Sequence, residues 1–89
     1  MKNSKDFLNA SNYVKKLKKI PTNDELLVLY KYFKQATEGN NNTPKPRLLD
    51  LKGTSKWNAW NTVKDINIHD CEVMYIKYVN SMIKKYGIK

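Results

Sequence analysis

The chain has 89 residues, of which 17 are lysine or arginine and 8 are aspartate or glutamate, so its formal net charge is +9. A chain of this length is expected to fold as one domain over residues 1–89 and to bury about 60–65% of its unfolded surface, which excludes an enclosed catalytic cavity. The one cysteine, Cys71, cannot form an internal disulfide, and the longest apolar run, Leu26 to Tyr30, has five residues where a membrane-spanning helix needs about 20. We therefore expect a cytoplasmic protein without disulfides or a transmembrane helix.

The first half of the chain predicts two helices. Residues 4–18 carry an apolar side chain at every third or fourth position, which is typical of a helix with one buried face. These positions are Phe7, Ala10, Val14 and Leu17. The second helix is expected to begin at Thr22, because Thr22 stands three residues before Glu25 and the two can form a capping box. Gly39 is expected to end it.

A long loop is expected between the second and third helices. Residues 40–51 contain three consecutive asparagines followed by Pro44 and Pro46, and two prolines so close together exclude a regular helix. Loops of this length are uncommon in small domains unless they serve a function.

Two further helices are predicted after this loop. The third is short, at residues 54–63, and its Trp60 is expected in the core. The fourth is expected from Asn67, which can cap it through Asp70, to Tyr86. No segment alternates as a half-buried strand would, so the fold class is all-α, a small four-helix bundle. Because one helix is short and one loop is long, the bundle is not expected to close on every side, and a groove is predicted.

Catalytic chemistry is not indicated. The one histidine, His69, and the one cysteine, Cys71, stand two residues apart, and residues at that spacing point to different sides of a helix. The carboxylates are scattered, which argues against a metal site, and the three glycines form no phosphate-cradling loop. We therefore predict a protein that is not an enzyme and has no metal or cofactor.

The most informative residues stand on the second and third helices. Tyr30, Phe33 and Lys34 occupy positions i, i+3 and i+4, so two aromatic rings and one ammonium group share a helix face. Such a face can border a polar ligand, or it can be an aromatic core stripe with a lysine that reaches solvent. Lys52 and Lys56 are four residues apart near the start of the third helix, where they can hold an anion or form a solvated charge pair.

These residues belong to two runs that resemble the acyl-CoA-binding protein family. Residues 30–39 read YKYFKQATEG, which is similar to the Tyr-Lys-Gln-Ala-Thr run and glycine of the family's second helix. Residues 49–53 read LDLKG and residues 56–60 read KWNAW, which is similar to the family's Leu-Asp-aromatic-Lys-Gly and Lys-Trp-x-Ala-Trp segments. The spacing between the runs also matches, and the resemblance extends over essentially the whole chain.

The resemblance implies an up-down-down-up bundle that holds a long-chain acyl-CoA ester in a groove open on one side. It implies that Tyr30 lies near the adenine ring and that Lys34 and Lys56 bind phosphate groups. The residues expected at the ligand are Lys15, Tyr30, Lys31, Tyr32, Phe33, Lys34, Lys52, Lys56 and Tyr75. Those expected along the acyl chain are Phe7, Ala10, Leu26 and Leu27.

Three departures from the family pattern concern the ligand. Phe33 stands where a tyrosine is common, so no hydroxyl contact to phosphate is expected there. Leu51 replaces an aromatic residue, and Arg47 stands near a position where glycine is frequent. These differences bear on the preferred chain length and leave Tyr30 and Lys34 as the family has them.

The implied function is that of a monomeric cytoplasmic carrier, which binds medium- to long-chain acyl-CoA esters and passes them to enzymes through transient contacts. Stable membrane insertion and a nucleic-acid partner are not expected. A basic nucleic-acid module is the first rival, and it is disfavoured because only one of the 17 cations is an arginine. A membrane-surface protein is the second rival, and it would use the lysine cluster of the first helix. That cluster consists of Lys15, Lys16, Lys18 and Lys19.

Overall fold

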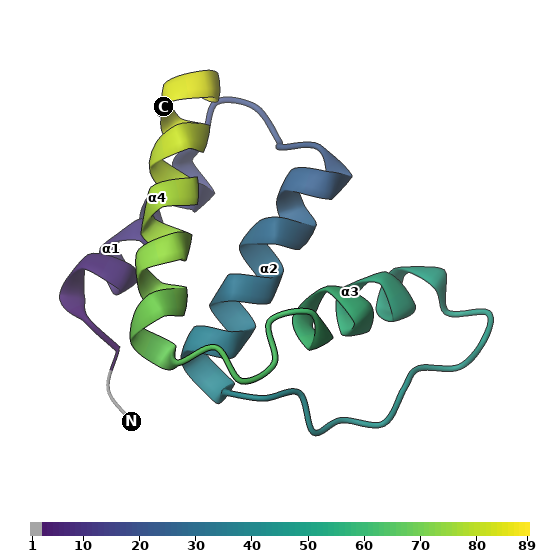
Figure 1. Ribbon diagram of the computed structural model, residues 1–89. Coiled ribbons are helices and arrows are strands. Elements are labelled where there is room, and N and C mark those ends of the chain that lie inside the picture. The colour runs from purple at the N-terminus through teal and green to yellow at the C-terminus, as the bar shows by residue number, and fades with distance from the viewer. Residues whose placement is uncertain (1–2) are drawn as a thin grey trace.

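Four α-helices and one 3₁₀ turn make up the structure, a computed structural model that describes residues 3–89 (Figure 1). In chain order the elements are α1 (Lys5–Tyr13), the 3₁₀ turn η1 (Val14–Lys16), α2 (Asn23–Glu38), α3 (Leu51–Asn61) and α4 (Ile68–Tyr86). In Figure 1, α1 and α4 run upward and α2 runs downward, while α3 runs mainly across the view, from right to left, and slightly downward. The predicted all-α bundle, with its long loop between α2 and α3, is therefore confirmed.

Side chains just before the helices determine where they begin. The hydroxyl of Ser4 caps α1. At α2, the Thr22 hydroxyl accepts a hydrogen bond from the Glu25 backbone N–H, and the Glu25 carboxylate accepts one from the Thr22 N–H. This is the predicted capping box. Asn67 caps α4, also as predicted, by accepting from the backbone N–H of Asp70 at 2.8 Å.

The first helix is shorter than the predicted range of residues 4–18. The α-helical part ends at Tyr13, and the chain passes through η1 into extended backbone at Leu17. There Leu17 pairs with the carboxy-terminal tail, and the Lys18 N–H donates to the Gly87 carbonyl at 2.9 Å. This long-range pairing satisfies backbone groups that a longer helix would otherwise have used, and local spacing gives no sign of it.

The third helix, α3, spans Leu51–Asn61, so it begins and ends earlier than the predicted range of residues 54–63. Gly53, which the prediction placed before the helix, lies inside its first turn. The Asp50 carboxylate accepts a hydrogen bond from the backbone N–H of Gly53 at 2.9 Å and thereby caps the helix. The Asp50 carboxylate lies so close to Gly53 that a Cβ at position 53 would require the carboxylate to shift. The cap therefore moves the start of α3 to Leu51.

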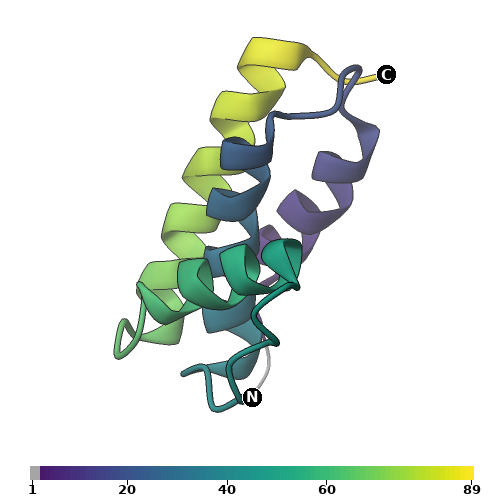
Figure 2. The ribbon, with the colours of Figure 1, turned by 90° about the vertical axis from the view of Figure 1, so that its right-hand side faces the viewer.

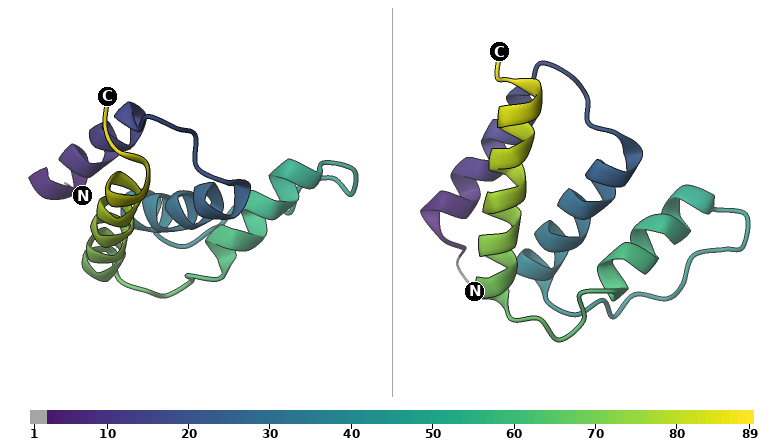
Figure 3. Two further views of the ribbon diagram at one scale, coloured as in Figure 1. Left: turned by 90° about the horizontal axis from the view of Figure 1, so that it is seen from above. Right: turned by 45° about the horizontal axis from the view of Figure 1, so that its top comes forward.

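The core lies among α1, α2 and α4. Its buried cluster consists of Phe7, Ala10, Leu29, Ala36, Cys71, Tyr75 and Val79. Within residues 3–89, α3 packs against α2 and against no other helix. Figures 2 and 3 show α3 on the outer side of α2, away from α4. Trp60 is buried, as expected, although it belongs to α3 and lies outside the main cluster.

Three further features of the described residues concern membrane-spanning helices, metal sites and free thiols. No helix within residues 3–89 is both long enough and apolar enough to span a bilayer. In the same range, no three His, Cys, Asp or Glu side chains gather where they could hold a metal ion. Cys71 is a free thiol in the core, and burial, together with the nearby Asp70 carboxylate, raises its pKa.

Candidate functional site

A groove of about 640 Å³ runs between α2 and α3. It is lined by Asn23, Leu26, Leu27 and Tyr30 of α2 and by Leu51, Lys52, Ser55 and Lys56 of α3. The leucines give the groove an apolar lining, while the lysines and the tyrosine add cationic and aromatic groups. A concave site of this size, mostly apolar with a few polar groups, suits an organic ligand.

Helical spacing explains why these residues meet. The α2 residues stand at i, i+3, i+4 and i+7, and the α3 residues at i, i+1, i+4 and i+5, so each set occupies one strip of its helix. Leu26 and Leu51 are exposed on these strips. The two helices therefore present apolar surface that the described chain does not cover.

Lys56 and Tyr30 face each other across this groove. The ammonium nitrogen of Lys56 lies 5.2 Å from the centre of the Tyr30 ring, which is a cation–π contact. Lys52 stands one turn earlier, in the first turn of α3, where unpaired backbone N–H groups also attract anions. Among residues 3–89, neither lysine forms an ion pair with a carboxylate. The groove is therefore suited to a ligand that carries negative charge and a planar ring.

Lys34 lies one turn beyond Tyr30 on α2 and does not line the groove itself. Its ammonium group pairs with the Glu38 carboxylate and lies 4.9 Å from the centre of the Trp60 ring. Because Trp60 belongs to α3, Lys34 is directed toward the same helix that Tyr30 faces. The structure thus places Lys34 beside the groove, in a contact that joins α2 to α3.

Phe33 and Tyr75 form an aromatic cluster with Phe7. The centre of the Phe7 ring lies 5.6 Å from that of Phe33 and 4.9 Å from that of Tyr75. Burial raises the pKa of Tyr75 to about 12, so its hydroxyl stays protonated at neutral pH. Phe7 and Ala10 are buried in the core, whereas Phe33 is exposed. These predicted site residues therefore lie in and on the α1–α2–α4 core and do not line the α2–α3 groove.

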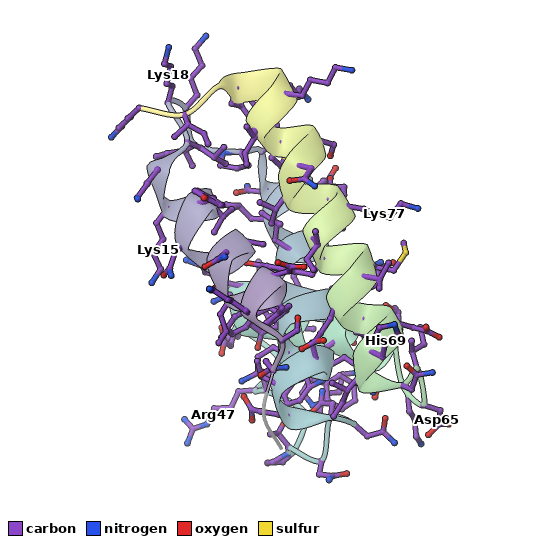
Figure 4. The ribbon with its side chains drawn as sticks, turned by 90° about the vertical axis from the view of Figure 1, so that its left-hand side faces the viewer. Lys15, Lys18, Arg47, Asp65, His69 and Lys77 are labelled. Carbon is purple, nitrogen blue, oxygen red and sulfur yellow. The ribbon has the colours of Figure 1, made fainter. Side chains whose placement is uncertain are left out.

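Three other predicted ligand residues lie farther away from the groove lining. Lys31 and Tyr32 line a smaller hollow of about 430 Å³ between α2 and α4, where the Lys31 ammonium lies 5.1 Å from the centre of the Tyr32 ring. Lys15 belongs to η1 and is exposed, and Figure 4 shows its side chain directed away from the helices. The groove lining thus unites only part of the predicted set, namely Leu26, Leu27, Tyr30, Lys52 and Lys56.

Three lining residues were not predicted, namely Asn23, Leu51 and Ser55. Asn23 and Ser55 belong to the same helical strips as predicted residues, so extending the spacing of Leu26 or Lys52 by one turn would have found them. Leu51 was noted only as a departure from the family pattern, because its position was assigned to the loop and not to the first turn of α3.

A polar network holds the ends of the loop between α2 and α3. The buried Gln35 amide donates to the side-chain oxygen of Asn40 at 2.8 Å. The Trp60 indole N–H is shared between the Gln35 amide oxygen, at 3.2 Å, and the Gly39 carbonyl, at 2.9 Å. Asp65, which adopts a φ of 69°, donates its backbone N–H to Asn40 at 2.8 Å. The network therefore ties the end of α2 to α3 and to the turn that follows it.

Known proteins are similar to this chain in sequence and in the arrangement of its helices. Residues 4–79 match the family model described as Acyl CoA binding protein. The chain belongs to the acyl-CoA-binding protein family. It is 48% identical over 81 residues to acyl-CoA-binding protein homolog 1 of Caenorhabditis elegans, which covers 91% of this chain and 94% of that protein. It is 47% identical over 84 residues to the acyl-CoA-binding protein homolog of Drosophila melanogaster, covering 94% and 98% of the two chains.

Solved structures of the acyl-CoA-binding protein family share the fold. The solution structure of the yeast acyl coenzyme A binding protein superposes with a TM-score of 0.78 at 39% identity and covers 96% of this chain and 99% of that one. The crystal structure of Oryza sativa acyl-CoA-binding protein 2 gives a TM-score of 0.85 at 30% identity, covering 90% and 89%. The resemblance seen in the sequence is therefore confirmed, and the family is one of binding proteins and not of enzymes.

Proposed function

We propose that the groove between α2 and α3 binds medium- to long-chain acyl-CoA esters such as myristoyl-CoA and palmitoyl-CoA. The observation that carries this proposal is the presence, in one groove, of exposed leucines together with Tyr30, Lys52 and Lys56. An acyl-CoA ester has the matching parts, namely an acyl chain, an adenine ring and several phosphate groups. The names of the nematode and fly relatives, both acyl-CoA-binding protein homologs, support the same ligand.

The lysines hold the phosphate groups in this proposal. Lys52 and Lys56 have no carboxylate partner among residues 3–89, so a diphosphate would compete only with water for them. Lys34 binds the ribose 3′-phosphate after it releases Glu38. Tyr30 offers its ring to the adenine once the Lys56 ammonium turns from that ring toward a phosphate.

The acyl chain supplies most of the binding free energy. At about 0.8 kcal/mol for each buried methylene, roughly fourteen methylenes offer up to about 11 kcal/mol, whereas an exposed ion pair contributes about 0.2–1 kcal/mol. The leucines of the groove receive this chain. Phe33 packs over Phe7, so contact between the acyl chain and Phe7 requires the Phe33 ring to move.

A binding protein of this kind keeps acyl-CoA esters in solution and delivers them. We expect a monomeric cytoplasmic carrier and pool former that contacts acyl-CoA-using enzymes transiently. The net charge of +9 attracts an anionic ester from a distance and so speeds its capture.

Calorimetric titrations with palmitoyl-CoA, free CoA and palmitate test the proposal. The ester should bind far more tightly than either half, because only the ester engages both the apolar lining and the lysines. Equal affinity for CoA and palmitoyl-CoA would overturn it, since the acyl chain would then contribute nothing. A series of esters with longer acyl chains should show affinity rising until the groove is full and then levelling off.

A further inference from the structure

Three leucines at the start of α3 project into solvent. Leu48, Leu49 and Leu51 are 90%, 91% and 75% exposed. A single exposed leucine is ordinary on a protein surface, but three within four residues concentrate exposed apolar side chains at one place, as interaction sites do. We call residues 48–51 the leucine knuckle.

Positive charge accompanies the leucine knuckle. Residues 39–64 contain five cations and one carboxylate, that of Asp50. This carboxylate is engaged in capping α3 through the backbone N–H of Gly53. Figure 4 shows the Arg47 side chain directed away from the body of the molecule, and the Lys45 ammonium lies 5.8 Å from the centre of the Trp57 ring. Neither cation forms an ion pair within residues 3–89, so the knuckle is complementary to an anionic surface.

The leucine knuckle is continuous with the groove. Leu51 belongs to the knuckle and also lines the groove, and Lys52 follows it directly. Figure 1 shows the end of the loop and the beginning of α3 at the edge of the molecule farthest from α1 and α4. A partner that binds the leucine knuckle would therefore contact one end of the groove and would not contact the core.

We infer that the leucine knuckle inserts reversibly into the interfacial region of an anionic lipid bilayer, with Lys45 and Arg47 at the lipid phosphates. Apolar side chains bordered by cations are the composition of peripheral membrane anchors. A protruding tip suits a soft bilayer, since a protein partner would need a preformed pocket to receive it. Three leucines are too few for permanent attachment, so the contact is transient. The inference requires no acyl-CoA and therefore stands or falls independently of the proposed function.

Co-sedimentation of the ligand-free protein with vesicles tests this inference. The vesicles contain phosphatidylcholine with about one-third phosphatidylserine, and pure phosphatidylcholine vesicles serve as the reference. We expect binding to the anionic vesicles that weakens when salt is raised to about 0.15 M. The double variant Leu48→Ala/Leu49→Ala should weaken the partition by about tenfold or more. The double variant Lys45→Gln/Arg47→Gln should do so by a similar factor.

Matched variants on α4 separate the knuckle from general surface effects. Val73→Ala/Met74→Ala removes two neighbouring exposed apolar side chains, and Lys77→Gln/Lys84→Gln removes two exposed cations. Both controls should retain most of the vesicle binding. Equal losses in the control and knuckle variants would overturn the inference, and so would equal binding to both kinds of vesicle or no binding at low salt.

Two further readouts keep the outcome clear. Because the leucine knuckle is exposed, its alanine variant should melt at the wild-type temperature and bind palmitoyl-CoA in solution as the wild type does. If the chain ignores vesicles but self-associates through Leu48 and Leu49, as judged by sedimentation of wild type and variant, the knuckle is a protein contact and the inference is wrong.

Discussion

The ammonium group of Lys56 lies 5.2 Å from the centre of the Tyr30 ring, so one side chain of α3 meets one side chain of α2 across the groove. The proposed function assigns these two groups to different parts of one ligand, the cation to a phosphate and the ring to adenine. A cation–π contact at an exposed site contributes about 0.5–1 kcal/mol, whereas a hydrogen bond to a charged group contributes about 1.5–3 kcal/mol. In the proposed complex, the phosphate contact of Lys56 would therefore more than offset the loss of the cation–π contact.

The first prediction concerns the Lys56 charge. Lys56→Gln should weaken palmitoyl-CoA binding by about tenfold or more, because it removes one charge-assisted hydrogen bond. The melting temperature should fall only slightly, since the variant loses a single half-buried cation–π contact. Calorimetry and thermal melts measure the two effects. Lys64→Gln removes an exposed lysine outside the groove lining and is the control. Equal loss of affinity in both variants would mean that only the overall charge matters.

The second prediction concerns Lys34. Lys34→Ala should lower the affinity for palmitoyl-CoA by about tenfold and the free energy of unfolding by no more than about 2 kcal/mol. The small stability effect is expected because the residue loses one surface ion pair with Glu38 and one contact with the Trp60 ring. If melting falls sharply while the affinity holds, Lys34 is a structural residue and its assignment to the phosphate is wrong.

The third prediction concerns Glu38, whose substitution should raise the affinity for palmitoyl-CoA. Glu38 pairs with Lys34 in the free protein and competes with a ligand phosphate for the same ammonium group. Glu38→Gln should therefore strengthen palmitoyl-CoA binding about two- to fivefold, because the ligand no longer has to break an exposed ion pair in order to bind Lys34. In a Lys34→Ala background the same substitution should have no effect, because the competition no longer exists. Titration of the single and double variants measures this coupling, and a gain that persists without Lys34 would refute it.

The fourth prediction concerns the network that holds α3. Gln35→Leu keeps a side chain of similar size but removes the hydrogen bonds to Asn40 and Trp60. The free energy of unfolding should fall by about 1–3 kcal/mol, since buried polar partners lose one of their contacts. Urea denaturation measures it. Thr37→Ala, an exposed change two residues along the same helix, should stay within about 0.5 kcal/mol of wild type.

The fifth prediction concerns acid stability. Hydrogen bonds from the Lys85 ammonium, the Tyr86 hydroxyl and the Thr22 backbone N–H lower the pKa of Glu25 from 4.5 to about 2. A folded-state pKa below the unfolded value means that the ionised group stabilises the fold above pH 4.5. This contribution is lost as the pH falls through about 2.

Glu25→Gln should consequently be less stable than wild type at neutral pH, and the difference should shrink as the pH falls from about 4.5 to about 2. Urea denaturation at several pH values measures the difference. Lys85→Gln, which removes the main donor, should show the same narrowing. A wild-type advantage over Glu25→Gln that stays constant across the whole acid range would contradict the assignment.

Helix beginnings could be predicted where a single turn contains the signal. Thr22 with Glu25, and Asn67 with Asp70, are capping pairs three residues apart, and both form as expected. The end of α1 could not be predicted, because it depends on pairing between Leu17 and the far end of the chain. The start of α3 was predicted too late for a different reason. Glycine usually lies outside a helix, whereas here Gly53 lies in the first turn and donates its backbone N–H to the capping residue Asp50.

The groove could be predicted only in part, because a sequence run on a helix faces every direction. Tyr30 and Leu26 share one strip and line the groove, whereas Lys31 and Tyr32 follow Tyr30 directly and lie toward α4. A run of neighbouring residues therefore identifies the helix that carries the site, but it does not show which of these residues lie on the face that lines the groove. The spacing of Phe7 and Ala10 predicted a buried face for α1, but it could not show that this face packs into the core among α1, α2 and α4 and away from the groove.

Among the helices that the structure describes, α3 packs against α2 alone, so the groove has one wall that belongs to the core and one that does not. Separating α3 from α2 disrupts a single helix contact and the hydrogen bonds of Trp60. Displacing α2 would break the whole core. Hydrogen exchange should accordingly be faster in α3 than in α2 or α4, and a ligand that bridges both walls should slow it. The two walls of the groove thus differ in how the rest of the chain holds them, since the core fixes the α2 wall while the α3 wall is held through its contact with α2.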